Sequence, residues 1–472
     1  MGYKKGFLCS LIMKLSFLGA ARQVTGSMYL LQTESNFNIL IDCGLNYEKG
    51  VPREENANFV FDPSEIDVVV LTHAHIDHSG NLPTLFASGF EGRVFCTEPT
   101  AALVDILLAD SANIEAKRVN RKRKKKEVTR RLFGHKQVMD VMDNIVTMPF
   151  NKPFELESKV TVEFVPAGHI LGAASIVFKI KEKKQTKTIG FTGDLGKSDA
   201  KVVVQPRPMK DLDYLVMEGT YGARFHVEER SPEATLMEYI QKTCIDQPGR
   251  LIIPAFSVGR TQAILFTLNQ IFRSNKIKPI RVFTDSPLGI NSGEIHENHL
   301  SYLNQEAIDF VSEYKNLFRF PFLDIVEDKS DEDDMLRYYE PSIIVSSAGM
   351  LEGGRIQRHI ANNIQNPQCT ILIAGYCTPG TLGATLLEGR QSVRVNKQER
   401  QVYAKIARTD VFSAHPDQKE LVSYFKSVQS NSKLKHVFLS HGEESSLLEF
   451  KDVLSTDYQD IDVPELNQTY DL

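Results

Sequence analysis

The sequence has no paired cysteines, no long apolar run and no internal repeat. Its six cysteines are scattered over 472 residues, and no two stand as C-x-x-C. This disfavours a disulfide framework and a cysteine zinc site, and it favours a reducing compartment. No apolar run reaches the roughly 18 residues that a membrane-spanning helix requires. We therefore expect a cytoplasmic protein without a membrane partner, and the length predicts two or three domains.

An overall positive charge is also missing. The chain has 55 Lys and Arg against 60 Asp and Glu, a net charge of -5, so any polyanion must be held by a local patch. One candidate is the run from Lys117 to Arg131, where ten positive charges are opposed by Glu127 alone. A solvated surface segment is the simpler interpretation, but we expect this run to attract nucleic-acid phosphates.

The N-terminus only partly resembles a signal peptide. Lys4 and Lys5 precede a short apolar stretch, but Lys14 interrupts it and a strand-like segment follows. We expect residues 1–12 to form an N-terminal extension rather than a secretion signal, with Met13 as an alternative start.

Short apolar segments alternate with turns and helices along most of the chain. Many are rich in β-branched residues and bounded by Gly, Pro, Asn or Asp, which predicts a mixed α/β fold. Examples are residues 38–42, 67–72, 160–165 and 175–180. From about residue 211 the units lengthen, as in an α/β domain with a parallel sheet. Here we expect strands at 251–255, 281–284 and 342–346, and a helix over 259–272.

The motif H-x-H-x-D-H directly follows an apolar strand at residues 68–71. It contains His73, His75, Asp77 and His78. A loop at a strand end can bring three imidazoles and a carboxylate to one point. Such ligands without thiolate suit zinc in a hydrolytic site that keeps positions open for water. The full motif is far more specific than an isolated H-x-H pair.

Three further ligand-type residues stand where an expected strand meets a glycine-containing turn. They are His169, Asp194 and His441. Taken alone, each histidine would more often be a buried residue of the core. The shared context favours a metal site, because glycine lets the backbone approach closely.

The order of Asp42, the H-x-H-x-D-H motif, His169, Asp194 and His441 resembles the metallo-β-lactamase superfamily. The resemblance implies an αββα sandwich that binds two Zn²⁺, although the same ligands accept Mn²⁺. It assigns His73, His75 and His169 to the first ion and Asp77, His78 and His441 to the second. Asp194 would bridge the ions, and Asp42 would support a histidine ligand from behind.

Other motifs resemble the β-CASP branch of that superfamily, whose members cut nucleic acids. Residues 217–222 (MEGTYG) and 412–417 (FSAHPD) resemble its motifs A and B, and His441 fills motif C. Further stretches resemble bacterial and archaeal β-CASP ribonucleases, relatives of the polyadenylation-factor endonuclease. They are residues 253–262, 285–288, 346–355 and 375–383. The likeness runs from Lys14 to about Phe450.

This resemblance implies an α/β fold in which a β-CASP domain is inserted into the metallo-β-lactamase domain. We expect the metallo-β-lactamase domain over 13–212 and 397–472 and the inserted domain over 213–396.

The resemblance also implies catalytic roles. His415 would protonate the leaving alkoxide, Glu218 would hold its imidazole, and Asp77 would belong to the catalytic group as well as to the ligands. Four residues of the inserted domain are expected to contact RNA phosphates, with ordinary salt bridges as the alternative for the arginines. They are Arg260, Ser347, Arg355 and His359.

The function implied is hydrolysis of RNA phosphodiester bonds by a hydroxide held between two zinc ions. We expect endonucleolytic cleavage of single-stranded RNA that leaves 5′-phosphate and 3′-hydroxyl ends. A 5′-exoribonuclease, a catalytically silent RNA-binding subunit and a small-molecule hydrolase of the same fold are the alternatives. The sequence leaves open whether the chain forms a homodimer.

Overall fold

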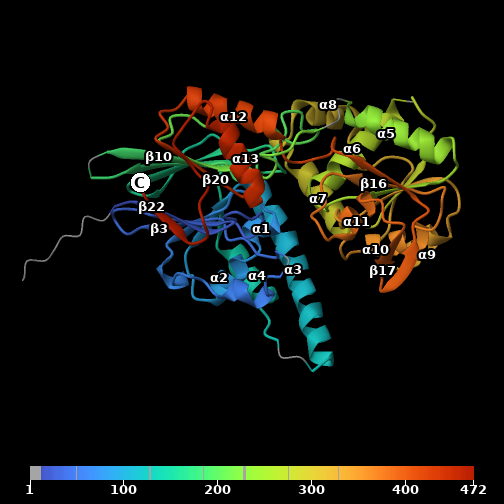
Figure 1. The fold of residues 1–472 in the computed structure, drawn as a ribbon, viewed down its shortest axis with the longest axis horizontal. Coiled ribbons are helices and arrows are strands. Elements are labelled where there is room, and N and C mark those ends of the chain that lie inside the picture. Colours follow the sequence, from blue (N-terminus) through green and yellow to red (C-terminus); the bar gives the residue numbers. More distant parts are fainter. Residues whose placement is uncertain are drawn as a thin grey trace, which may run out of the picture.

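The computed structural model describes residues 12–48, 50–126, 129–183, 185–226, 230–274, 276–327 and 329–472. Apart from Ile12, the expected N-terminal extension therefore lies outside the described residues. The chain forms two lobes that lie side by side (Figure 1).

The first lobe is a sandwich of two seven-stranded sheets. One sheet has the order β22-β1-β2-β3-β4-β5-β6 and the other β21-β20-β11-β10-β9-β8-β7. The strands of the first sheet are β1 (Lys14–Gly19), β2 (Met28–Gln32), β3 (Asn38–Ile41), β4 (Val68–Val70), β5 (Arg93–Cys96), β6 (Ile145–Thr147) and β22 (Gln468–Asp471). Those of the second are β7 (Phe154–Glu157), β8 (Val160–Pro166), β9 (Ala174–Lys181), β10 (Thr186–Phe191), β11 (Tyr214–Glu218), β20 (His436–Ser440) and β21 (Ile461–Asp462).

Apolar side chains fill the space between these sheets. Phe17, Ile41, Phe164, Phe178 and Phe191 are buried in one cluster to which both sheets contribute. Helices cover the outer faces (Figure 1). Those beside the first sheet are α1 (Ile76–Ser79), α2 (Leu82–Ala87), α3 (Glu98–Lys124) and α4 (His135–Asp143), and those beside the second are α12 (Gln418–Ser430) and α13 (Glu444–Leu454). This arrangement confirms the expected αββα sandwich.

The second lobe contains a six-stranded sheet in which every pairing is parallel, with the order β14-β13-β15-β12-β16-β19. Its strands are β12 (Arg250–Pro254), β13 (Arg281–Thr284), β14 (Leu323–Ile325), β15 (Ser342–Ser346), β16 (Thr370–Ala374) and β19 (Lys405–Thr409). The lobe also has helices α5 (Pro232–Ile240), α6 (Arg260–Arg273), α7 (Pro287–Asn298), α8 (Gln305–Tyr314), α9 (Lys329–Arg337), α10 (Ile356–Asn363) and α11 (Leu382–Leu387), and the hairpin β17 (Ser392–Val395) and β18 (Gln398–Gln401). Central strands such as β15 are buried along their whole length, as a parallel sheet covered on both faces requires.

Strand pairing places the junctions between the lobes differently from the sequence motifs. β11 hydrogen-bonds to β10 and β20 in the sandwich, whereas β19 pairs with β16 in the parallel sheet. From this pairing we propose that the inserted lobe extends from between β11 and α5 to just after β19; the limits 213 and 396 expected from the motifs stay a prediction.

Within the described residues, no helix combines the length and the apolar character needed to cross a membrane. The longest, α3, has 27 residues and ends in four consecutive basic side chains.

Candidate metal centre

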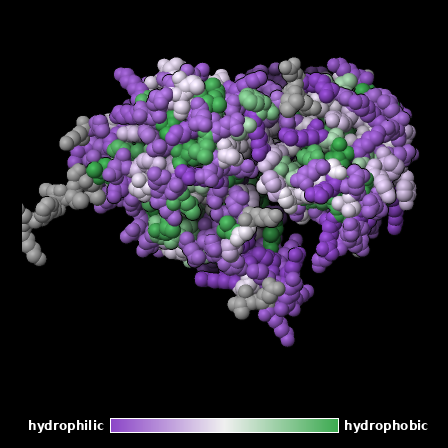
Figure 2. All heavy atoms as spheres, in the orientation of Figure 1, coloured by the Kyte–Doolittle hydropathy of each residue, from purple (hydrophilic) through white to green (hydrophobic). Residues whose placement is uncertain are grey.

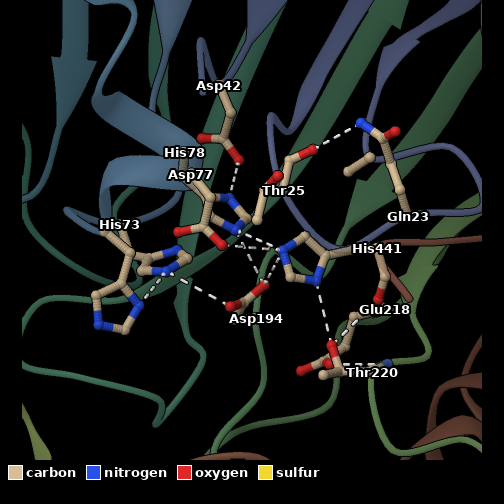
Figure 3. A network of polar contacts seen from close by, with 12 residues as sticks. Gln23, Thr25, Asp42, His73, Asp77, His78, Asp194, Glu218, Thr220 and His441 are labelled. Carbon is tan, nitrogen blue, oxygen red and sulfur yellow. Dashed lines mark hydrogen bonds and ion pairs between the residues drawn. The ribbon is translucent and has the colours of Figure 1, made fainter. Parts of the chain in front are cut away.

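The site lies at one rim of the sandwich, where strands from both sheets end. The H-x-H-x-D-H loop follows β4 of the first sheet, and His169, Asp194 and His441 follow β8, β10 and β20 of the second. Because β8, β10 and β20 run in the same direction, their carboxyl ends reach the same edge. Residues far apart in the sequence therefore converge (Figure 3).

The first group of donors comprises three imidazoles and one carboxylate. Nδ1 of His75 lies 3.1 Å from Nε2 of His73 and 3.1 Å from Nε2 of His169. Oδ2 of Asp194 lies 3.7 Å from His73 Nε2 and 3.6 Å from His169 Nε2. One ligand atom from each of the four residues falls within 4.8 Å of the others.

The second group lies directly beside the first. Nε2 atoms of His78 and His441 are 3.0 Å apart, and Oδ2 of Asp77 lies 3.7 Å from the latter. Oδ1 of Asp194 approaches His78 Nε2 at 3.2 Å and His441 Nε2 at 3.5 Å. The two oxygens of Asp194 thus face different donor groups. In the second donor group, burial acts to lower the pKa of His78 and of His441, but the carboxylates around them, Asp194 first, outweigh burial and raise it.

The protonation of the first group suits metal binding. Burial lowers the pKa of His73, of His169 and of His75, the last to about 4, so their imidazoles are neutral. Burial also acts to raise the pKa of Asp194, but the histidines around it outweigh that effect and lower it. The ring nitrogens that meet at 3.1 Å could each turn a lone pair toward one cation, which would then stabilise the arrangement. The residues therefore fit the divalent ions expected for this site.

Hydrogen bonds behind the ligands hold the rings in place. Nδ1 of His78 donates to Oδ2 of Asp42 at 2.7 Å, which turns its Nε2 toward the centre. Asp42 also accepts hydrogen bonds from the backbone N–H and the hydroxyl of Thr72, at 2.7 and 2.8 Å. The Thr72 hydroxyl in turn accepts from Nδ1 of His73 at 3.1 Å. Asp42 thus contacts His78 directly and His73 through Thr72.

Backbone geometry adds to this constraint. Asp42 and His441 have positive φ angles of 57° and 53°, unusual for residues other than glycine. At Gly44, a Cβ would lie 1.7 Å from the carbonyl oxygen of Asp77. Only glycine allows the loop after β3 to pack so closely against the ligand loop.

Thr220 is a site residue that the sequence reasoning did not single out. Its hydroxyl donates to the carbonyl oxygen of His441 and accepts from Nδ1 of the same residue, both at 3.1 Å (Figure 3). The contact fixes the tautomer that presents Nε2 to the donor group. Its position two residues after Glu218, in the same motif, was the available signal.

His415 and Glu218 form a pair at the edge of the centre. Nδ1 of His415 lies 3.4 Å from the Glu218 carboxylate, which is buried and accepts the backbone N–H of Leu195 at 2.6 Å. The ring centroids of His415 and His169 are 4.6 Å apart. Burial acts to lower the pKa of His415, but nearby carboxylates, Glu218 first, outweigh it and raise that pKa. A protonated imidazole is therefore favoured beside the metal ligands.

Of the four expected phosphate contacts, the structure brings Arg260 to the centre. Together with His169 it lines a cavity of about 60 Å³ between the lobes. Its guanidinium lies 4.9 Å from the Phe256 ring and donates to the Phe412 carbonyl at 3.3 Å. Among the described residues, no carboxylate forms an ion pair with it.

The other three lie elsewhere in the inserted lobe and do not line that cavity. Arg355 donates to the carbonyl oxygens of Val326 and Glu327. His359 is 1% exposed and its Nε2 lies 2.6 Å from Asp285. Ser347 is half-buried after β15. Their contact with RNA stays a prediction, and for His359 it would require a change in the buried pair.

Comparisons with known proteins agree with this architecture. Family models match residues 37–236 (beta-lactamase superfamily domain), 261–386 (Beta-Casp domain) and 399–464 (Zn-dependent metallo-hydrolase RNA specificity domain). Ribonuclease TTHA0252 of Thermus thermophilus is 30% identical over 97% of this chain and 99% of its own. The RNase J-like protein of Methanocaldococcus jannaschii is 28% identical over 92% and 94%. The transcription termination factor FttA of Methanosarcina mazei is 27% identical over 92% of this chain and 68% of its own.

A solved structure, a protein of unknown function from Enterococcus faecalis, shares the fold with a TM-score of 0.56 at 14% identity, covering 98% of this chain and 100% of its own. Two sheets between helical layers, with histidine- and aspartate-bearing loops at one rim, define the metallo-β-lactamase class of hydrolase. Within that class, the identity over nearly the whole of both chains shows that this protein belongs to the β-CASP ribonuclease family.

Proposed function

We propose that this protein is a metal-dependent ribonuclease that hydrolyses RNA phosphodiester bonds and leaves 5′-phosphate and 3′-hydroxyl ends. The observation that carries the proposal is the position of Asp194, whose two oxygens face two adjacent donor groups. A site for one metal ion would need only one of these donor groups, so the presence of both favours two ions.

Two Zn²⁺ suit these donors best, because imidazole and carboxylate ligands without thiolate are typical of hydrolytic zinc sites. Mn²⁺ is the alternative that metal analysis would distinguish. When bound, such a pair of ions lowers the pKa of water and stabilises the charge that develops on the phosphate.

The proton for the leaving oxygen would come from His415. Its raised pKa favours the protonated imidazole, and Glu218 holds the ring through Nδ1, so that Nε2 is free to donate. Asp77 would be a metal ligand in the second donor group and would orient the attacking water.

Arg260 would bind a phosphate oxygen next to the bond that is cut. A desolvated guanidinium without a carboxylate partner gains most from an anion that enters its cavity. Since Arg260 comes from the inserted lobe and His169 from the sandwich, RNA would lie between the two.

The decisive experiment uses single-stranded RNA labelled at either the 5′ or the 3′ end. Labelled fragments of intermediate length from both RNAs would support the proposed endonuclease. Release of labelled mononucleotide from the 5′-labelled RNA, with stepwise shortening of the 3′-labelled RNA, would show a 5′-exonuclease. Chelator should abolish cleavage in either case. RNA binding without cleavage under any metal would instead show a silent RNA-binding subunit.

A small-molecule hydrolase of the same fold is the remaining alternative. The inserted lobe, which supplies Arg260, disfavours this alternative, because a lobe of this size is not needed to hold a small substrate. Hydrolysis of a thioester without any cleavage of RNA would establish it.

A further inference from the structure

The run of positive charges noted in the sequence forms the end of a single long helix. α3 begins beside the metal centre, where the hydroxyls of Thr97 and Thr100 donate to the carbonyl oxygen of Gly172, three residues after His169. The helix then passes α7 of the inserted lobe. Its last turns project beyond both lobes (Figure 1).

The root of the helix is firmly packed, whereas its tip is free of the core. Val119 is the last residue of α3 that is buried. Before it, Glu115 is fully buried and bound to Arg53 and Arg118. The projecting part is hydrophilic over its whole visible surface (Figure 2).

Five side chains at the tip are exposed cations, and we call them the basic arm: Arg121, Arg123, Lys124, Lys125 and Lys126. Within the described residues none of them forms an ion pair, while the neighbouring Lys122 pairs with Glu54. The helix macrodipole favours cations in its last turn. Five of them within six residues, however, repel one another, and a polyanion would relieve that repulsion.

The basic arm differs in sign of charge from the rest of the chain. Residues 117–131 carry nine net positive charges, so the other residues together carry about -14 against -5 for the whole chain. The net charge of the other residues therefore repels a flexible polyanion, whereas this projection attracts it.

We propose that the basic arm binds the phosphates of the RNA substrate at a distance from the bond that is cut. This inference rests on the proposed ribonuclease function and adds a second, remote contact to it. A helix of 27 residues spans about 40 Å at 1.5 Å per residue. At the roughly 3.4 Å spacing of stacked nucleotides, the arm reaches RNA about a dozen nucleotides from the metal centre.

The length of the RNA therefore provides the test. The arm variant replaces its five cations by Gln (Arg121→Gln, Arg123→Gln, Lys124→Gln, Lys125→Gln, Lys126→Gln). A matched control removes five other exposed cations (Lys210→Gln, Lys276→Gln, Lys278→Gln, Arg394→Gln, Lys433→Gln). Each is compared with the unchanged chain on single-stranded RNAs of 6 and 30 nucleotides, and circular dichroism checks the fold.

We expect the arm variant to bind the 30-mer at least tenfold more weakly at low salt. The slope of log K against log salt should flatten by up to about 3.5, because each phosphate contact on a single strand contributes about 0.7. Binding and cleavage of the 6-mer should not change, and the control should behave like the unchanged chain.

Binding is measured in a His415→Ala background, so a failure of the proposed ribonuclease function does not obscure the result. Equal losses on both RNAs, equal losses in the control, or no loss on the 30-mer would overturn the proposal. So would binding of polyglutamate as tight as that of the 30-mer, because the arm would then be a surface for acidic proteins.

Discussion

At the scale of single residues, Asp194 connects the two halves of the centre. Replacing it with Ala removes a ligand from both donor groups at once. We expect Asp194→Ala to lose bound metal and cleavage together. Metal content by mass spectrometry and the rate of RNA cleavage, measured on the same preparation, check this.

His415→Ala is the matched comparison. Because this residue hydrogen-bonds to Glu218 and offers no ligand atom to either donor group, the variant should keep its metal yet lose about 10²–10⁴-fold in cleavage rate. Equal loss of metal in the two variants would contradict the separate roles.

Thr220 should affect activity only through His441. In Thr220→Val the imidazole loses the partner that fixes its tautomer, and we expect metal affinity or activity to fall about 10–100-fold. Thr220→Ser, which keeps the hydroxyl, should restore both. Titration of the metal-free protein with zinc measures the affinity, and a Val variant that binds zinc normally would refute the role.

Residue types at motif positions could be predicted from the sequence, but their contacts could not. The H-x-H-x-D-H motif is local, so its residues necessarily share one loop. Which ring nitrogen faces the centre depends on partners such as Asp42 and Thr220, which come from other strands. The pairing of His359 with Asp285 joins residues 74 positions apart, and no local pattern indicates that a histidine will be buried in this way.

At the scale of elements, the root of α3 depends on Glu115. This carboxylate accepts hydrogen bonds from Arg118, Arg53 and the backbone N–H of Leu132. Burial acts to raise its pKa, but Arg118 and Leu132 outweigh burial and lower it.

Glu115→Gln should therefore lower the free energy of unfolding by about 1.5–3 kcal/mol at neutral pH. A lowered pKa in the folded state stabilises the protein above the ordinary pKa of glutamate, and this stabilisation is lost as pH falls toward the lowered value. The difference between the two proteins should thus shrink in acid. Urea unfolding at several pH values measures it, with Glu91→Gln at an exposed position as control; a difference that does not change with pH would contradict the prediction.

Strands and amphipathic helices were predictable where local pattern and packing agree. The expected strand at 160–165 is β8 (Val160–Pro166), and the expected helix at 259–272 is α6 (Arg260–Arg273). The helical form of the basic run was not predicted, because its like charges disfavour a helix locally. Packing of the preceding turns, up to Val119, supplies the stability that the tip lacks.

At the scale of the whole molecule, bound metal would join the two sheets of the sandwich. Ligands come from the loop after β4 in one sheet and after β8, β10 and β20 in the other. Removing metal with a chelator should lower the melting temperature by roughly 5 °C, since a ligand that binds only the folded state stabilises it. Thermal unfolding with and without added zinc measures the shift, which His415→Ala should retain and Asp194→Ala should lack. An unchanged melting temperature would argue against such a link.

The presence of an inserted lobe was predictable from its motifs, but the pairing of β19 was not. β19 follows the β17–β18 hairpin and still returns to the parallel sheet beside β16. That pairing joins residues more than 30 positions apart, and the strand itself, Lys405–Thr409, has two basic residues and is only partly buried, as is typical of an exposed edge. Only the assembled sheet shows where the strand belongs.

The two lobes also touch through a small set of side chains next to a ligand. The Tyr376 hydroxyl from the inserted lobe donates to Glu443 at 3.2 Å, and the Arg224 guanidinium stacks 3.7 Å from the Tyr376 ring. Glu443 stands only two residues after His441. If a long RNA entering between the lobes breaks the contact between Tyr376 and Glu443, the movement of Glu443 would also shift His441 in the second donor group. Thermodynamic reciprocity then requires the metal ion to bind the RNA-bound and the RNA-free enzyme with different affinities. Bound metal would change the affinity for RNA by the same factor.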